Sequence, residues 1–422
     1  MRVERLVESR AAVIELTVEE AAGLVAVGRR LASQSRHWGD RDFERAGKRS
    51  LIECEPYGLG RWSVRIPNAV GVLRVDELQL VVEPKIPLPH LLHLFERSGA
   101  FPRVDSSLAD LSTAESLWPL VAAWYIVSLE HLIRSGLASG YRQANAELVA
   151  ARGRIRTDAT SRAFLKGRVI IDCEYEEFDV DTPLNRVLRS AAEAVASSAA
   201  LTWDLRRRAS RAIDHMEGVS RLLASDRVAA EPERHTSRYA VPLQLAGHVL
   251  AATGRGIDAG EEHGHAFLIR TPDMAEEGLR QIASDALRGK TTVSKRTRFL
   301  VGSHHSLTPD LVFGTRAIGD VKYKLWAGDW DRADLYQLVT FATGFGVHSA
   351  LRVGFSPVRH DAAPVTVGPV RAAVADWLCD ATIDPVEAER MLAAQLRAWW
   401  GETERYASDQ VERPSESQAR AS

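Results

Sequence analysis

The sequence predicts a multidomain protein of mixed class, in part α+β and in part α/β, and three observations support this expectation. The chain has 422 residues, enough for two or three domains that each bury a core. It is 45% hydrophobic and 26% charged, which is typical of a globular protein. Short strand patterns fill the N-terminal part, helical patterns dominate the middle, and helices alternate with strands afterwards.

These patterns divide the chain into segments. We expect residues 1–105 to form a β-rich domain, residues 106–255 a mixed helical domain, and residues 265–400 an α/β domain. The stretch 254–264 is rich in glycine and acidic residues, which is typical of a linker. Residues 402–422 are polar, and we expect them to form a disordered tail.

Local signals place several elements in the first two domains. Thr17 and Glu20 have the spacing of a capping box and predict a helix that continues to about Ser33. Asp76-Glu77 predicts a tight turn between two strands. Further along, Asp181-Thr-Pro183 predicts a helix start, because a proline in the first turn loses no hydrogen bond.

Composition excludes several classes of protein. The formal charge of −2 gives no global signature of nucleic-acid binding, so any DNA contact depends on local patches. Cys54, Cys173 and Cys379 lie far apart, which predicts neither a zinc site nor a disulfide framework and fits a reducing cytoplasm. The most apolar long stretch, 117–133, is too short and too interrupted to span a bilayer. We therefore expect a cytoplasmic protein without a signal peptide or membrane segment.

Residues 308–325 carry the clearest chemical pattern, because they predict a β-hairpin with carboxylates on both arms. A short apolar run at 311–313 predicts one strand, and the run at 317–325 predicts the second after a turn. Pairing of these strands brings Asp310 and Asp320 together across the hairpin. Two carboxylates are then available at one point.

A lysine joins the two carboxylates. Asp320 and Lys322 are two residues apart, so in a strand both side chains lie on the same face. Carboxylates hold Mg²⁺, the ion polarises a phosphate and activates a water, and a lysine steadies the developing charge. The pattern thus indicates phosphodiester cleavage, although an Asp and a Lys flanking a strand residue are also common on solvated sheet edges.

The elements around the hairpin follow an α-β-β-β-α-β order, which is the order of a restriction-endonuclease-like core. The predicted elements are a helix at 272–287, strands at 291–301, the hairpin, a helix at 332–345 and a strand at 350–355. Residues 365–370 predict a further strand, and residues 385–400 a C-terminal helix.

Five motifs in a fixed order resemble those of the McrC family, the nuclease subunits of McrBC-type restriction systems that depend on 5-methylcytosine. The resemblance covers most of residues 60–360. The motifs are Val81-Val-Glu-Pro-Lys-Ile86, Arg152-Gly-Arg154, Cys173-Glu-Tyr-Glu-Glu-Phe178, Asp181-Thr-Pro-Leu-Asn-Arg186, and Pro309-Asp310 with Asp320-Val-Lys-Tyr-Lys324.

The resemblance implies a PD-(D/E)xK endonuclease that cuts double-stranded DNA together with an AAA+ GTPase resembling McrB. That partner would recognise modified cytosine and translocate DNA, and the McrC-like subunit would dock on it through the N-terminal β domain and stimulate its hydrolysis of nucleotide. By the same resemblance, Asp310 and Asp320 would bind Mg²⁺ and Lys322 would be the catalytic lysine, whereas Lys324 matches a family lysine of less certain role.

The resemblance also implies residues outside the hairpin. Gln337, in the family's Tyr-Gln pair, would orient groups near the metal. The family commonly has a tyrosine four residues later, where this chain has Phe341. An acidic metal ligand from the first helix would be Glu276 or Glu277, of which we favour Glu277.

The chain shows no nucleotide-binding motif of its own. Gly289-Lys290-Thr291 has only part of the phosphate-loop pattern, and a helix precedes it where one should follow, so GTP or ATP would belong to the partner. Lys290, Lys295, Arg296 and Arg298 either contact DNA phosphates or protect a strand edge from aggregation, and the sequence leaves both open.

The leading hypothesis is therefore a Mg²⁺-dependent endonuclease subunit of a modification-dependent restriction system. Two alternatives remain open. One is a non-cleaving adaptor that activates a partner AAA+ NTPase, and the other is a stand-alone DNA repair nuclease that shares only the C-terminal fold. The retained Asp310, Asp320 and Lys322 favour the enzyme, since an adaptor has no reason to keep a buried carboxylate pair.

Overall fold

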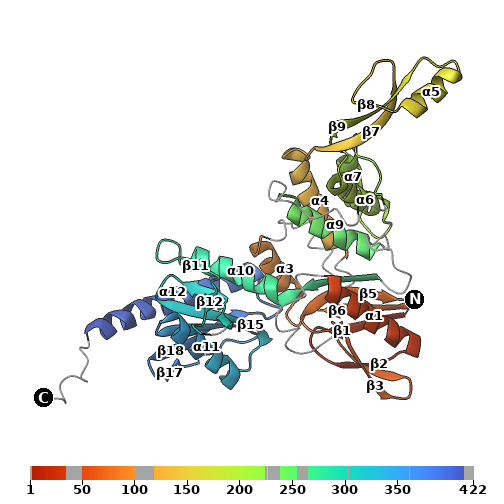
Figure 1. The fold of residues 1–422 in the computed structure, drawn as a ribbon. Coiled ribbons are helices and arrows are strands. Elements are labelled where there is room, and N and C mark those ends of the chain that lie inside the picture. Colours follow the sequence, from red (N-terminus) through yellow and green to blue (C-terminus); the bar gives the residue numbers. More distant parts are fainter. Residues whose placement is uncertain are drawn as a thin grey trace. The chain divides into compact units, whose positions relative to one another are not determined.

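The computed structural model describes residues 2–34, 50–99, 118–223, 226, 238–253, 265–302, 304–360 and 362–412 (Figure 1). Contacts divide the chain into two compact units. The first, which we call the two-segment unit, combines Met1–Phe101 with Leu268–Ser422, and the second, the middle unit, is Pro102–Phe267. The predicted N-terminal and C-terminal domains thus share one unit, and the predicted linker 254–264 lies outside the described residues.

The first sheet of the two-segment unit has the order β1-β6-β5-β10. Its strands are β1 (Arg2–Val7), β6 (Leu78–Glu83), β5 (Ala69–Val75) and β10 (His265–Arg270). β5 and β6 form the predicted antiparallel pair around the Asp76-Glu77 turn, where Asp76 has a φ of 48°. The sequence analysis missed β1, and it assigned the β10 region to the last domain although β10 belongs to this sheet.

A smaller sheet and a helix follow β1. The sheet has the order β2-β4-β3, with β2 (Ala12–Glu15), β4 (Arg61–Arg65) and β3 (Glu53–Gly58). The capping box that opens α1 (Val18–Gln34) is confirmed, because Thr17 and Glu20 exchange both side-chain to backbone hydrogen bonds, at 2.9 and 3.1 Å.

The second large sheet has the order β11-β14-β15-β16-β18-β17, and β15, β16 and β18 are parallel. Its strands are β11 (Val293–Ser294), β14 (Leu311–Phe313), β15 (Ala317–Leu325), β16 (Ser349–Ser356), β18 (Val370–Leu378) and β17 (Val365–Val367). A separate short pair, β12 (Arg298–Phe299) and β13 (Ser306–Leu307), lies between β11 and β14 along the chain. The order α10, β11, β14, β15, α11, β16 agrees with the predicted one.

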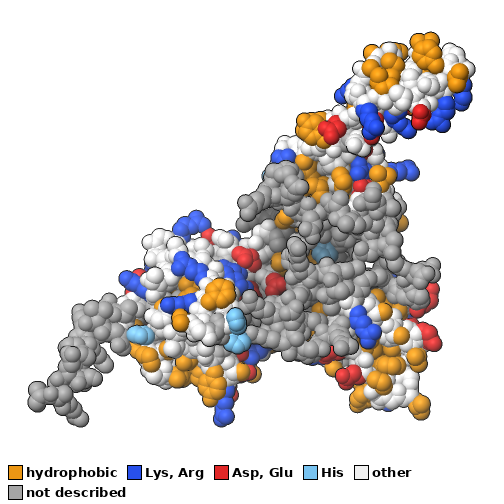
Figure 2. Space-filling view, viewed as in Figure 1, with side chains coloured by type: hydrophobic (Ala, Val, Ile, Leu, Met, Phe, Trp, Pro, Cys, Tyr) orange, Lys and Arg blue, Asp and Glu red, His pale blue; other side chains and the backbone are white. Residues whose placement is uncertain are grey.

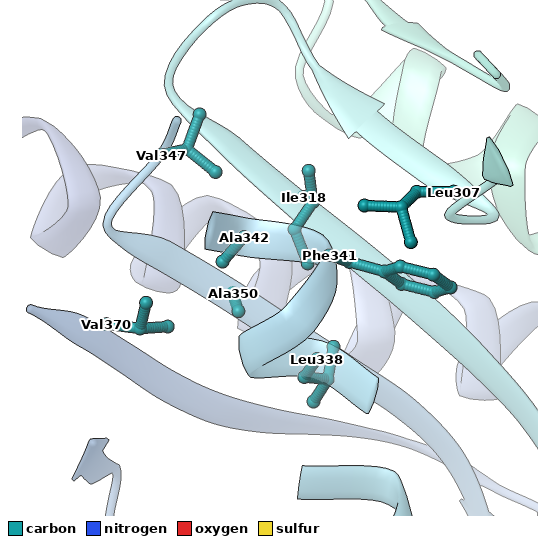
Figure 3. Close-up of a cluster of buried hydrophobic side chains, with 8 residues drawn as sticks. All are labelled: Leu307, Ile318, Leu338, Phe341, Ala342, Val347, Ala350 and Val370. Atoms are coloured by element: carbon teal, nitrogen blue, oxygen red, sulfur yellow. The ribbon is translucent and has the colours of Figure 1, made fainter. Parts of the chain in front are cut away.

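Helices cover both faces of this sheet. α11 (Arg332–Phe345) packs on one face, where its Leu338 and Phe341 join Ile318 of β15 and Ala350 of β16 in a buried apolar cluster (Figure 3). Phe341 is 8% exposed and belongs to this core, so the ring at the position where the family has tyrosine serves packing here.

α12 (Pro385–Glu412) and α10 (Thr271–Ala286) lie on the other face of the sheet. Phe313 of β14 contacts Trp399 of α12 edge to face, with 4.9 Å between ring centres. α10 also packs closely on α3 (Leu88–Arg97), because a Cβ on Gly278 would lie 2.4 Å from the carbonyl oxygen of Leu94. The predicted tail starts too early, since α12 is helical as far as Glu412.

Two elements of the prediction were incomplete. The single strand expected at 365–370 is a pair, β17 and β18, and β18 is a central strand of the sheet. In the middle unit, α5 (Thr157–Leu165) was not predicted.

The middle unit combines helices with a three-stranded sheet of order β7-β9-β8. Its elements are α4 (Trp118–Arg134), β7 (Gly140–Leu148), β8 (Arg154–Ile155), α5, β9 (Ile171–Asp179), α6 (Pro183–Ser197), α7 (Trp203–Asp214) and α9 (Ala240–Ala252). Around this sheet, exposed apolar side chains and Lys or Arg side chains share one surface (Figure 2). The large exposed apolar residues are Tyr141, Val149, Ile155, Phe164, Leu165, Val169 and Phe178.

The Asp181-Thr-Pro-Leu-Asn-Arg186 motif holds the middle unit together. Thr182 caps α6 as predicted, and the fully buried Asn185 amide donates to the carbonyl oxygens of Ala138 and Val180 at 2.9 and 2.7 Å. Arg186 donates two hydrogen bonds to Asp226, at 2.8 and 2.6 Å. Among the described helices of the whole chain, none is long and apolar enough to cross a membrane.

A fully buried carboxylate joins the two segments of the two-segment unit. Glu8, at the end of β1, accepts hydrogen bonds from the Tyr323 hydroxyl of β15 and the Thr271 hydroxyl of α10, both at 2.6 Å. It also accepts one from the backbone N–H of Lys85 at 3.1 Å. The Lys85 ammonium lies 3.9 Å from the centre of the Tyr323 ring, so the Glu-Pro-Lys-Ile motif contacts the Asp-Val-Lys-Tyr-Lys motif directly.

We predict that Glu8→Ala lowers the free energy of unfolding by about 3 kcal/mol or more, because it leaves several buried donors without an acceptor. Chemical denaturation monitored by circular dichroism measures the change. Glu83→Ala is the matched control, since Glu83 makes an exposed ion pair with Arg5 at 2.9 Å and should cost less than about 1 kcal/mol. An equal loss of stability in the two variants would show that Glu8 does not hold the two segments together.

Candidate active site

The predicted hairpin is present with its predicted bounds. β14 and β15 pair antiparallel, with Leu311 opposite Gly319 and Phe313 opposite Ala317. Gly314 opens the turn with a φ of 56°, in the left-handed region that favours glycine. Asp310 precedes β14, and its Oδ2 accepts a hydrogen bond from the backbone N–H of Val321 at 3.0 Å. The pairing therefore brings Asp310 to the residue next to Asp320, as predicted.

Asp320 is a carboxylate placed inside the sheet. It is 3% exposed, and it lies on the same face of β15 as Lys322, whose Nζ is 2.5 Å from its Oδ2. Burial and, to a smaller extent, the charge of Asp310 raise the pKa of Asp320 to about 7, although Lys322 acts in the opposite direction. The ionised form of a carboxylate with a raised pKa is stabilised by any cation that binds beside it.

Lys322 connects β15 with α11. Besides the contact with Asp320, its Nζ donates a hydrogen bond to Oε1 of Gln337 at 2.7 Å and lies 4.0 Å from Oδ1 of Asp334. The structure thus places Gln337 at the hairpin, where the sequence analysis expected it. It brings together Asp310, Asp320, Lys322 and Gln337 from three elements.

A second group of charged side chains lies beside Lys322 and Asp320. Lys324 contacts Asp331 at 3.1 Å and Asp334 at 2.9 Å, and Asp331 also caps α11 by accepting from Ala333 N–H. The buried Arg352 of β16 donates to Asp334 at 3.3 Å. The sequence analysis missed Asp334 and Arg352, although Asp334 is three residues before Gln337 and so lies on the same helix face.

The first helix brings Glu276 to the site, and not Glu277, which we favoured. Glu277 is half exposed and forms an ion pair with Arg280 of its own helix at 3.0 Å. Glu276 faces Lys295, with 3.3 Å between Oε2 and Nζ. Burial and the nearby charge of Asp310 raise the pKa of Glu276 to about 8, although Lys295 acts in the opposite direction. Glu276 is therefore the acid of α10 at the site.

Lys295 is a further member of the site. Its Nζ lies 3.3 Å from Oε2 of Glu276 and 3.4 Å from Oδ1 of Asp310. The sequence analysis considered this lysine only as a DNA contact or as a charge on a strand edge. Its position beside two acids was not visible from the sequence, because it depends on how β11 pairs with β14.

The donor set fits a magnesium ion. In the part of the chain that the structure describes, no group of three or more His, Cys, Asp or Glu side chains could by itself hold a metal. Mg²⁺ does not need such a cage, because it keeps several waters and uses one or two carboxylates together with substrate phosphates. Asp310 and Asp320 supply such a pair of carboxylates, and they are the residues that would hold it.

Comparison with family models decides the family. Residues 64–351 match the model described as "McrBC 5-methylcytosine restriction system component". The chain belongs to this family. The match includes the hairpin and most of the motifs on which the predicted resemblance rests, so that prediction is confirmed.

A solved structure of an McrBC assembly shares the fold. It is a refined half-complex from the tetradecameric assembly of Thermococcus gammatolerans McrB AAA+ hexamers with bound McrC. It has a TM-score of 0.60 and 16% identity, and the match covers 94% of this chain and 100% of that one. The cryo-EM structure of the Thermococcus gammatolerans McrBC complex has a TM-score of 0.41 and 15% identity, covering 68% and 88%. No curated protein sequence matches the chain.

We predict that Asp320→Asn stabilises the metal-free protein at pH 8, by up to about 4 kcal/mol. The folded-state pKa of about 7 lies above the usual value for Asp. The contribution of this carboxyl to the stability of the fold is therefore lost as pH rises through 7. The difference in stability between the variant and the wild type should therefore shrink as pH falls toward 4. Thermal unfolding of both proteins across this pH range, with a chelator present, measures it.

Asp331→Asn is the control of opposite sign. The hydrogen bond from Lys324 lowers the pKa of Asp331, and backbone N–H groups at the start of α11 lower it further. This carboxylate stabilises the fold above its unfolded pKa, so its replacement should lower stability at pH 8. A destabilised Asp320→Asn protein at pH 8 would contradict our account of Asp320.

Proposed function

We propose that this chain is the Mg²⁺-dependent endonuclease subunit of an McrBC-type restriction system, with a PD-(D/E)xK core that cuts double-stranded DNA. The observation that carries the proposal is the convergence of Asp310, Asp320, Lys322 and Gln337 from three elements around one buried carboxylate. Membership in the McrBC family supports it independently.

The chain's own residues have separate tasks in this proposal. Asp310 and Asp320 would hold Mg²⁺, which would polarise the phosphate and lower the pKa of an attacking water. Gln337 accepts from Lys322 and so fixes the ammonium beside Asp320, where its charge offsets the negative charge that develops on the phosphate. Asp334 holds Lys324 and Arg352 next to this group, which keeps α11 aligned with β15.

An AAA+ partner belongs to the same proposal. The solved assembly that shares this fold is described as McrB AAA+ hexamers with bound McrC, and this chain would dock on a similar partner that binds GTP or ATP. Two surfaces are candidates for this docking: the N-terminal sheets, and the apolar surface around β7, β8 and β9, because exposed apolar groups of this kind mark interaction sites.

We predict that Asp320→Ala and Lys322→Ala each lower DNA cleavage by at least about a hundredfold, since the first removes a metal ligand and the second a positive charge needed at the phosphate. The assay combines the full chain with an AAA+ partner of the McrB type, methylated or unmethylated plasmid, Mg²⁺, and GTP or ATP. Glu276→Ala should also reduce cleavage, whereas Glu277→Ala is the matched control and should leave it unchanged.

The outcomes separate the proposed nuclease from its alternatives. If the wild-type chain raises nucleotide hydrolysis by the partner without any cleavage, it is a non-cleaving adaptor. If it cuts without the partner and regardless of methylation, it is a stand-alone nuclease. If Asp320→Ala cuts as well as wild type, the site lies elsewhere.

A further inference from the structure

Lys295 occupies a position between two acids of the site. The two carboxylate oxygens of Asp310 have different partners. Oδ2 accepts a hydrogen bond from the backbone N–H of Val321, and Oδ1 lies 3.4 Å from Nζ of Lys295. The other neighbour of the Lys295 ammonium is Oε2 of Glu276, at 3.3 Å. The ammonium is therefore shared by one carboxylate of the hairpin and one of α10.

The sheet itself places this lysine. Lys295 directly follows β11, whose Ser294 pairs with Val312 of β14, and β14 begins next to Asp310. The backbone thus carries Lys295 alongside Asp310 before any side-chain contact is considered. A lysine fixed in this way differs from a surface lysine that meets an acid by chance.

Many phosphodiester-cleaving sites use two metal ions about 3.5–4 Å apart, with carboxylates shared between them. Here the point between Glu276 and Asp310 is taken by the chain's own cation. We propose that Lys295 replaces a second divalent ion, so that the site binds one Mg²⁺, at Asp310 and Asp320. This inference rests on the proposed nuclease function and specifies how many ions that function uses.

The charges of the site agree with a single ion. In their ionised forms, Glu276, Asp310 and Asp320 carry three negative charges, and Lys295 and Lys322 carry two positive ones, which leaves −1. One Mg²⁺ together with the negative charge of the scissile phosphodiester brings the total to zero. A second divalent ion beside Lys295 would leave an excess charge of +2 among groups that lie a few ångströms apart, which is unfavourable.

Counting bound Mn²⁺ on the full-length chain tests the inference without any cleavage assay. Free Mn²⁺ is measured by electron paramagnetic resonance during a titration at constant ionic strength. We expect one ion on the wild type and two on Lys295→Met, because removing the ammonium frees Glu276 and Asp310. Lys295→Gln should behave as Lys295→Met does, and circular dichroism checks that each variant is folded.

Three controls make the count specific. Arg296→Met removes the charge of the exposed next residue and should keep one ion. Adding Glu276→Gln to Lys295→Met should remove the second ion but not the first. Asp320→Ala should lose the ion that the wild type binds.

Each result decides between the claims. Two ions on the wild type, or one ion on both folded Lys295 variants, would overturn the role of Lys295. In that case, loss of the bound ion in Asp320→Ala would still support the proposed metal site. No ion on the wild type overturns the metal site and this inference together.

Discussion

The structure of the site depends on one costly feature, the burial of the Asp320 carboxylate within a sheet. A buried ionised group is tolerated only when charges and donors surround it. Here Lys322 of the same strand supplies the positive charge, and Gln337 of the covering helix holds that lysine, whereas Asp310 beside the paired strand adds a second negative charge. Even so, the pKa of Asp320 is raised to about 7, which shows that the protein alone does not fully compensate the charge.

β15 performs two tasks because its side chains alternate between faces. Asp320, Lys322 and Lys324 point toward α11, and this face holds the polar site. Tyr323 points the other way, where its hydroxyl donates to the buried Glu8 of β1. Lys322 is therefore adjacent to a residue that anchors the strand to the N-terminal segment. This explains why the N-terminal and C-terminal segments form one compact unit.

Much of this site could be predicted from the sequence, because the information was local. The apolar run at 311–313, the turn at Gly314 and the alternation in 317–325 set both strands of the hairpin, and a two-residue spacing set the common face of Asp320 and Lys322. The resemblance to a known family added Gln337, which spacing alone would not identify.

What the sequence did not reveal depends on long-range packing. Glu276 and Glu277 are neighbours about 100° apart around a helix, and only the packing of α10 decides which of them faces the sheet. Lys295 and β18 likewise acquire their roles through strand pairing. Phe341 could be noticed as a departure from the family pattern, but its place in the core under α11 required the structure.

The acids of the site are already matched with lysines of the same chain, and this has a consequence for metal binding. Lys322 contacts Asp320, and Lys295 contacts both Asp310 and Glu276. A cation that approaches Asp320 meets an ammonium beside it, so repulsion weakens its binding, and a negatively charged phosphate in the site strengthens it. Metal and DNA then favour each other's binding, since each compensates charge that the other brings. A site of this kind is electrostatically balanced only when its substrate is present.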